Sequence, residues 1–290
     1  MDAAKHVGNM KILGKLVVVL VGTLLSATAS AELNCGNLEE RLLFSKDKST
    51  QPAEYPWMGV LFQRKGQSFE NAGCNVVIVG ESHVLTTASC VRDHYDHPEM
   101  IAVRLGIWNE KDEPDEKLVC NERGFCVPGP VQQPVAAITM HPQADKVTGD
   151  IDLAILRLSD RIKMTAHVQP LCLQPISEPA SWINRYFHYG GFENSNYRKG
   201  KGLAMAISKN RCSRLSGKSS PSQNQFCAFP VERTVFYRGS AFMGMNIEKD
   251  VPRSFYLVGL LVKVVSEGGP TVFFIQDIKP WRRWIMENTR

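Results

Sequence analysis

The sequence predicts an all-β protein with one short helix near its C-terminal end. Short apolar runs recur along the 290 residues at the spacing expected of strands in a sandwich or barrel. Examples are residues 74–79, 84–86, 101–105 and 135–138. No helical period is sustained until residues 279–286, which suggest a short amphipathic helix. No internal repeat, low-complexity linker or long charge run divides the chain, so we expect a single compact unit.

Residues 1–31 have the features of a secretory signal peptide. Lys11 and Lys15 flank the start of the apolar run 16–21, and residues 29–31 offer small side chains for cleavage. The alternative is a membrane anchor, but the apolar run is too short to span a bilayer. We therefore expect a secreted, extracellular chain with no membrane contact after cleavage.

The start of translation remains open between Met1 and Met10. Beyond the signal peptide we expect an N-terminal extension over residues 32–50 and one large domain over residues 51–290. A hydrophobic content of 43% and a charged content of 22% suit a globular domain that buries a core.

The charge of the chain does not indicate nucleic-acid binding. Cleavage after residue 31 removes three lysines and one aspartate, so the formal charge falls from +5 to +3. A locally basic region surrounds residue 205, and we interpret it as a solvated face of the protein. It consists of Lys199, Lys201, Lys209, Arg211, Arg214 and Lys218.

All eight cysteines lie beyond the predicted signal peptide. They are at positions 35, 74, 90, 120, 126, 172, 212 and 227. An even number in a secreted chain implies disulfides formed in an oxidising compartment, although the count alone does not choose the pairs. No C-x-x-C pair with nearby histidines is present, so we expect no zinc site, and we expect no cofactor.

Several motifs follow one another in an order typical of a known family. They lie at residues 55–61, 84–90 (V-L-T-x-A-x-C), 103–108 (V-R-L-G-x-W), 141–158 (H-P…D), 168–173, 225–228 (Q-x-C-A) and 270–273. In this order they resemble the trypsin-like serine proteases of the chymotrypsin fold. The resemblance implies two six-stranded antiparallel β-barrels, over roughly residues 51–160 and 161–280.

The resemblance also places the family's catalytic triad on this chain. The histidine position is occupied by Ser89, the aspartate position by Asp152 and the nucleophile position by Arg238. A serine hydroxyl stays neutral near pH 7 and cannot accept a proton as imidazole does. We therefore expect a pseudo-protease, similar to the non-catalytic homologs of arthropods, in which Asp152 is a buried acid kept for hydrogen bonds.

Two alternatives keep a working site: a divergent active serine endopeptidase, or a different hydrolase that uses Asp152 and a relocated histidine. Ser240 could be the nucleophile, but Ala241-Phe242 would then replace two glycines and crowd the turn that exposes the serine. His83, His94 or His97 could replace the missing base. Nothing in the sequence brings these histidines within hydrogen-bond reach of a nucleophile, so we expect surface or structural roles.

The activation and specificity elements of the family are altered as well. Tyr237 occupies the position of the aspartate that would pair with a new amino terminus, and no Ile-Val-Gly-Gly is present. Residues 41–44 are the nearest candidate and lack both glycines. A buried ammonium without a partner is costly. We therefore expect the activating amino terminus and the aspartate that would pair with it to be absent together. Residues 262–267 replace the usual wall of the specificity pocket.

The resemblance implies four disulfides. They are Cys74–Cys90, Cys212–Cys227, Cys35–Cys172 and Cys120–Cys126, the last closing a small loop like one found in arthropod members.

With no catalytic demand, the loops of such a fold are free to serve recognition. We expect a binding or regulatory protein with an extracellular protein partner, in a proteolytic or immune cascade. Tyr237, Arg238 and Lys263 are the binding candidates, since tyrosine and arginine are favoured interface anchors. Tyr237 could instead fill the vacated site as part of the core. The oligomeric state stays open.

Overall fold

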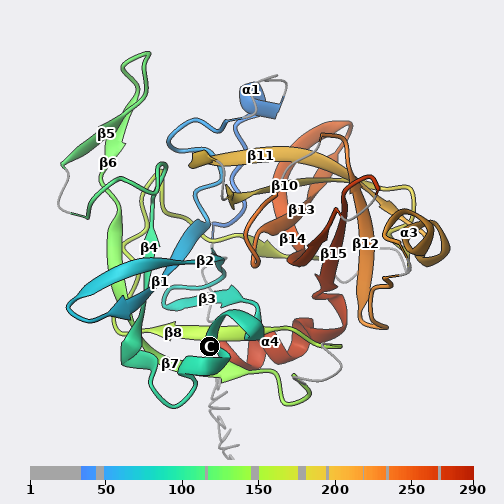
Figure 1. Ribbon diagram of the computed structural model, residues 1–290. Helices are drawn as coiled ribbons and strands as arrows, with labels where there is room; N and C mark the ends of the chain where they lie inside the picture. The colour runs from blue at the N-terminus through green and yellow to red at the C-terminus, as the bar shows by residue number, and fades with distance from the viewer. Residues whose placement is uncertain are drawn as a thin grey trace, which may run out of the picture. The chain divides into compact units, whose positions relative to one another are not determined.

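The structure is a computed structural model whose described part is dominated by antiparallel strands (Figure 1). It describes residues 34–43, 49–114, 117–144, 150–175, 181–193, 196–217, 219–232, 235–266 and 269–290. The predicted signal peptide and Phe44 lie outside the described residues. Within the described part, no helix is both long and apolar enough to cross a membrane.

Six strands close the first barrel in the order β1-β2-β3-β8-β7-β4. Their bounds are Met58–Lys65 (β1), Ser68–Ile78 (β2), His83–Thr86 (β3), Ile101–Leu105 (β4), Val131–Met140 (β7) and Ala154–Leu158 (β8). Valine, isoleucine and leucine side chains fill the interior, and most of them are fully buried. The four apolar runs named from the sequence lie in β2, β3, β4 and β7.

The second barrel has an aromatic core. Its strands are β9 (Cys172–Leu173), β10 (Tyr186–Glu193), β11 (Asn196–Ile207), β12 (Gln225–Pro230), β13 (Ala241–Glu248), β14 (Val251–Val265) and β15 (Val272–Asp277). The sheet order β13-β10-β11-β12-β15-β14 closes through pairing of β13 with β14, and β9 adds to β14 in parallel. Inside, Tyr189 stacks on Phe242 and meets Phe273 edge-on. The predicted fold class of two six-stranded barrels is confirmed.

The helices are short. They are α1 (Glu40–Leu43), α2 (Ala88–Val91), α3 (Lys209–Leu215) and α4 (Arg282–Asn288), with 3₁₀ turns at Arg92–His94, Pro98–Met100 and Lys279–Trp281. The predicted C-terminal helix is the turn at Lys279 followed by α4. It docks through fully buried Ile285 and through Trp281 and Trp284, whose rings lie 4.4 and 4.9 Å from that of His141.

The four disulfides of the structure are the pairs that the resemblance implies. Cys35–Cys172, Cys74–Cys90, Cys120–Cys126 and Cys212–Cys227 are all formed. The Cys120–Cys126 bridge closes a two-stranded hairpin of β5 (Leu118–Cys120) and β6 (Cys126–Pro128). The resemblance predicts a small loop there, and the sequence pattern does not predict these two strands.

A buried lysine ties the N-terminal segment to β11. Lys199 is only 1% exposed, and its Nζ donates to the Tyr55 carbonyl at 3.2 Å. The Lys199 carbonyl accepts from the backbone N–H and the hydroxyl of Thr50. Burial lowers the pKa of Lys199 to about 7, and the nearby Glu54 carboxylate partly opposes that shift.

This burial predicts a pH-dependent contribution to stability. An unfolded lysine has a pKa of about 10.4, so between pH 7 and that value the unfolded chain binds more protons at Lys199 than the folded chain. Stability should therefore rise with pH in this window. We expect Lys199→Met to flatten the rise between pH 7 and 9, measured as the free energy of urea unfolding. Tyr55 keeps a donor in the variant, because its carbonyl also accepts from the Met58 N–H.

Lys263→Met is the matched control, because Lys263 is exposed. It should leave the pH profile unchanged. Parallel profiles for the parent and Lys199→Met would show that the buried amine does not titrate in this range.

Candidate functional site

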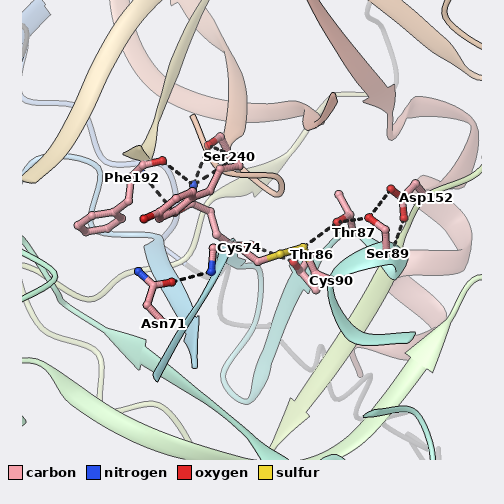
Figure 2. Close-up of a disulfide and its surroundings, with 12 residues drawn as sticks. Asn71, Cys74, Thr86, Thr87, Ser89, Cys90, Asp152, Phe192 and Ser240 are labelled. Carbon is pink, nitrogen blue, oxygen red and sulfur yellow. Dashed lines mark hydrogen bonds between the residues drawn. A yellow bond between two sulfur atoms is a disulfide. The ribbon is translucent and has the colours of Figure 1, made fainter. Parts of the chain in front are cut away.

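At the position where we expect the family's catalytic histidine, Ser89 is bonded to Asp152, the expected acid. Ser89 lies in the first turn of α2, and its hydroxyl donates to Asp152 Oδ2 at 2.7 Å. The Ser89 backbone N–H donates to Asp152 Oδ1 at 2.6 Å (Figure 2). Both carboxylate oxygens of Asp152 are thus used by one residue, and the carboxylate is 6% exposed.

Asp152 is also tied to the second barrel. Its backbone N–H donates to Gln276 Oε1 at 2.9 Å, and Gln276 is fully buried in β15. On the other side of Ser89, the Thr87 hydroxyl lies 3.2 Å from the Ser89 hydroxyl. The described hydrogen bonds around Asp152 therefore involve no histidine.

Within the described part of the chain, no candidate histidine is hydrogen-bonded to Ser89, Asp152 or Ser240. His94 is partly buried in the turn Arg92–His94, whereas His97 is exposed and bonds Glu99. His83 is buried at the start of β3, where burial and the neighbouring Arg157 lower its pKa. Its Nδ1 lies 3.3 Å from the hydroxyl of the adjacent Ser82. Among the described residues, no carboxylate is bonded to that ring, so the Ser82–His83 contact lacks the orienting acid of a triad.

A buried asparagine organises the turn at the nucleophile position. The Asn75 backbone N–H donates to the Arg238 carbonyl at 2.7 Å. The Asn75 side-chain Nδ2 donates to Ser240 Oγ at 2.7 Å, and its Oδ1 accepts from the Phe192 N–H at 3.1 Å. Asn75 is fully buried in β2 and so joins the first barrel to two segments of the second.

The turn itself leaves no room at Gly239. Its φ is +79°, and a Cβ there would lie 2.1 Å from the Asn75 carbonyl oxygen. Ser240 is fully buried, and its hydroxyl donates to the Tyr237 carbonyl at 2.8 Å while accepting from Asn75. The hydroxyl proton of Ser240 is thus committed to a backbone acceptor.

Tyr237 and Arg238 point into different surroundings. The ring of Tyr237 is half-buried and packs against an apolar cluster of Val60, Phe62, Ile107 and Phe192. Its hydroxyl lies 3.5 Å from Glu110 Oε2, which also accepts from Asn71. Arg238 is exposed, and its guanidinium has no hydrogen bond or ion pair within the described chain. The first residue thus fills space, whereas the second presents a charge.

Lys263 lies in β14, the strand that is hydrogen-bonded to this turn. It is exposed in β14, opposite Phe274 of β15. Two residues earlier, Leu261 exchanges backbone hydrogen bonds with Gly239 and Ser240. The strand that carries Lys263 is therefore joined directly to the turn that carries Arg238, and both side chains are exposed.

Sequence reasoning missed Asn75 and Glu110. Asn75 is the one amide within the apolar run Cys74–Val79, and a polar residue at a buried strand position could have been flagged. Glu110 gives no such signal. Burial raises its pKa, opposed by the hydrogen bonds from Asn71 and Tyr237, and its Oε1 has no partner in the described structure.

The described residues contain no group of three or more histidine, cysteine, aspartate or glutamate side chains placed to hold a metal ion. The site is therefore built from the residues already named. The two antiparallel barrels define a protein of the chymotrypsin class.

Comparison with known proteins agrees with this class. The family model of trypsin matches residues 45–235, and the chain belongs to the trypsin family. Phenoloxidase-activating factor 3 of Holotrichia diomphalia is 30% identical over 165 residues, which are 55% of this chain and 45% of that protein. Melanization protease 1 of Drosophila melanogaster is 25% identical over 275 residues, covering 89% of this chain and 68% of its own.

Some relatives are named as inactive. The inactive serine protease scarface of Drosophila melanogaster is 31% identical over 128 residues, which are 44% of this chain and 17% of that protein. The chain spans less than half the length of phenoloxidase-activating factor 3 and of scarface. Its relatives thus include both proteases and inactive homologs.

Replacing Asn75 tests the junction between the barrels. Asn75→Ala would leave the buried Phe192 N–H without its acceptor and would remove one of the two hydrogen bonds of the Ser240 hydroxyl. Because each unsatisfied buried group costs about 1–3 kcal/mol, we expect a loss of about 2–4 kcal/mol in the free energy of unfolding. Urea denaturation measures it.

Asn246→Ala is the matched control. Asn246 donates to the Ser254 hydroxyl within the β13–β14 hairpin and is only partly buried. Its loss should be within about 1 kcal/mol. Equal effects of the two substitutions would contradict the central role of Asn75.

Proposed function

We propose that this chain is a secreted, catalytically inactive serine protease homolog that acts as a binding or regulatory protein. The observation that carries the proposal is the Ser89–Asp152 pair, in which both carboxylate oxygens accept from Ser89. Catalysis in this fold needs a histidine that takes a proton from the nucleophile and is oriented by the acid. Here the acid orients a hydroxyl that is itself a donor.

The turn at the expected nucleophile position also lacks an activated nucleophile. An arginine side chain at position 238 offers no attacking atom, because guanidinium stays protonated in proteins. Ser240 is fully buried and donates to the Tyr237 carbonyl, and no histidine ring within the described chain bonds its hydroxyl. An activated serine needs an adjacent base, so neither residue supports acyl transfer.

The binding role rests on what the turn presents. Arg238 is an exposed cation at the position where the family carries out chemistry, and Lys263 adds a second exposed cation on the joined strand. Relatives named as inactive support a non-catalytic role, and relatives named for phenoloxidase activation and melanization suggest an extracellular cascade. A protein partner would bind where Arg238 is exposed.

Absence of catalysis is directly testable. The purified chain should not react with a fluorophosphonate probe, and its hydrolysis of peptide esters should be on the order of a millionfold below that of an active relative. Ser89→His alone should not restore turnover, because position 238 still lacks a nucleophile. Covalent labelling of Ser240 or Ser89, detected by mass spectrometry, would revive the active-endopeptidase alternative.

The binding role is tested by crosslinking the protein in its native fluid. We expect Arg238→Ala to abolish partner capture while folding is intact, because that side chain is exposed and has no hydrogen bond or ion pair among the described residues. Tyr237→Phe, which removes only the hydroxyl near Glu110, should capture normally. If Arg238→Ala captures the same partners as the parent, this turn is not the binding surface.

Secretion has its own measurement. Expression of the full chain in insect cells should release it into the medium, and N-terminal sequencing should begin near Glu32. Retention in the membrane fraction would contradict it.

A further inference from the structure

The outer face of the second barrel carries a strip of apolar side chains. Strand registers place Tyr186 of β10 opposite Met205 of β11, which in turn lies opposite Phe229 of β12. Two residues away along β11, and just past the end of β12, the Val231 N–H donates to the Leu203 carbonyl at 2.8 Å. Directly opposed residues of antiparallel strands share a face. These five residues, called the outer strip below, therefore lie side by side.

Three residues of the outer strip are exposed on a sheet face that usually carries polar side chains. Tyr186 is 62% exposed, Val231 61% and Leu203 40%. The alternate residues of the same strands, Phe187 and Ala204, already fill the barrel core. Since antiparallel strands with one solvated face usually alternate apolar and polar residues, apolar residues on both faces need a reason.

Part of the same face is already covered. In α3, Cys212 and Leu215 pack in one cluster with Met205 and Phe229, and the Cys212–Cys227 disulfide fixes the helix to β12. Figure 1 shows α3 at the ends of β11 and β12. The exposed members of the outer strip therefore continue a surface that α3 already buries.

The helix that borders the strip is basic. Arg211 and Arg214 are exposed, and neither side chain has an acidic partner within the described chain. Lys209 donates to the Ser222 carbonyl, and α3 contains no acid of its own. Glu232, the acid next to Val231, is already engaged in an interaction. Among the described residues, the helix itself therefore presents only positive charge at this edge.

We infer that the outer strip and α3 form a second binding surface, for a protein segment in which apolar and acidic side chains alternate. An exposed apolar patch rimmed by polar groups is typical of protein interaction sites. Complementary charge selects an acidic partner over a basic or neutral one. The apolar side chains would cover Tyr186, Leu203 and Val231, and the carboxylates would reach Arg211 and Arg214. This inference is independent of the proposed role of Arg238.

The test uses the full secreted chain and a short fluorescent peptide in which leucine and glutamate alternate. Fluorescence anisotropy should show binding at least about tenfold tighter than for the counterpart with glutamine, and raised salt should weaken it. Tyr186→Ser and Arg211→Glu should each weaken binding by about fivefold or more. Both sites are exposed, so circular dichroism and melting temperature should match the parent, and Val231→Ser serves as a second variant.

Two control variants separate this surface from others. Arg238→Ala alters the proposed recognition turn, and Ile247→Ser removes an apolar side chain that is 58% exposed on a different hairpin. Both should bind the peptide as the parent does. Equal binding of the glutamate and glutamine peptides, or unchanged binding by Tyr186→Ser, would overturn the inference. Self-association of the chain alone that Tyr186→Ser abolishes would overturn it too, since a second copy would then cover the strip.

Discussion

The contact between Asn75 and the turn at Arg238–Ser240 is the constraint on which the arrangement of the site depends. Asn75 is fully buried. Its backbone N–H and its side-chain amide donate to Arg238 and Ser240 in the second barrel. Its backbone carbonyl accepts from the Thr86 hydroxyl within the first barrel. Buried amide groups are costly when unpaired. The junction is therefore stable only when β2 and the turn adopt this one register.

The same constraint fixes the backbone of the turn at Arg238–Ser240. Gly239 adopts a left-handed φ, and its α-carbon lies so close to the Asn75 carbonyl that no side chain fits. Ser240 completes the network from the next position. A backbone geometry that exposes residue 238 is thus held by packing and hydrogen bonds of its neighbours.

Much of the fold is predictable because it follows from local patterns. Apolar runs locate β2, β3, β4 and β7, and motif order implies the cysteine pairs. The site is less predictable, since its contacts join residues far apart in the chain. Asn75 and Ser240 are separated by 165 positions, and no local pattern links them. Whether Tyr237 fills space or faces outward likewise depends on Phe192 and its neighbours in another strand.

Asp152 has a structural role at the start of α2. The first backbone N–H groups of a helix have no intrahelical acceptor, and Thr87, the residue before α2, offers no side-chain cap. Asp152 supplies that acceptor from a distant segment by bonding the Ser89 N–H, and it accepts the Ser89 hydroxyl as well. Ser89 directly precedes Cys90, so Asp152 also holds the backbone next to the Cys74–Cys90 bridge. The carboxylate is therefore explained by the donors that surround it.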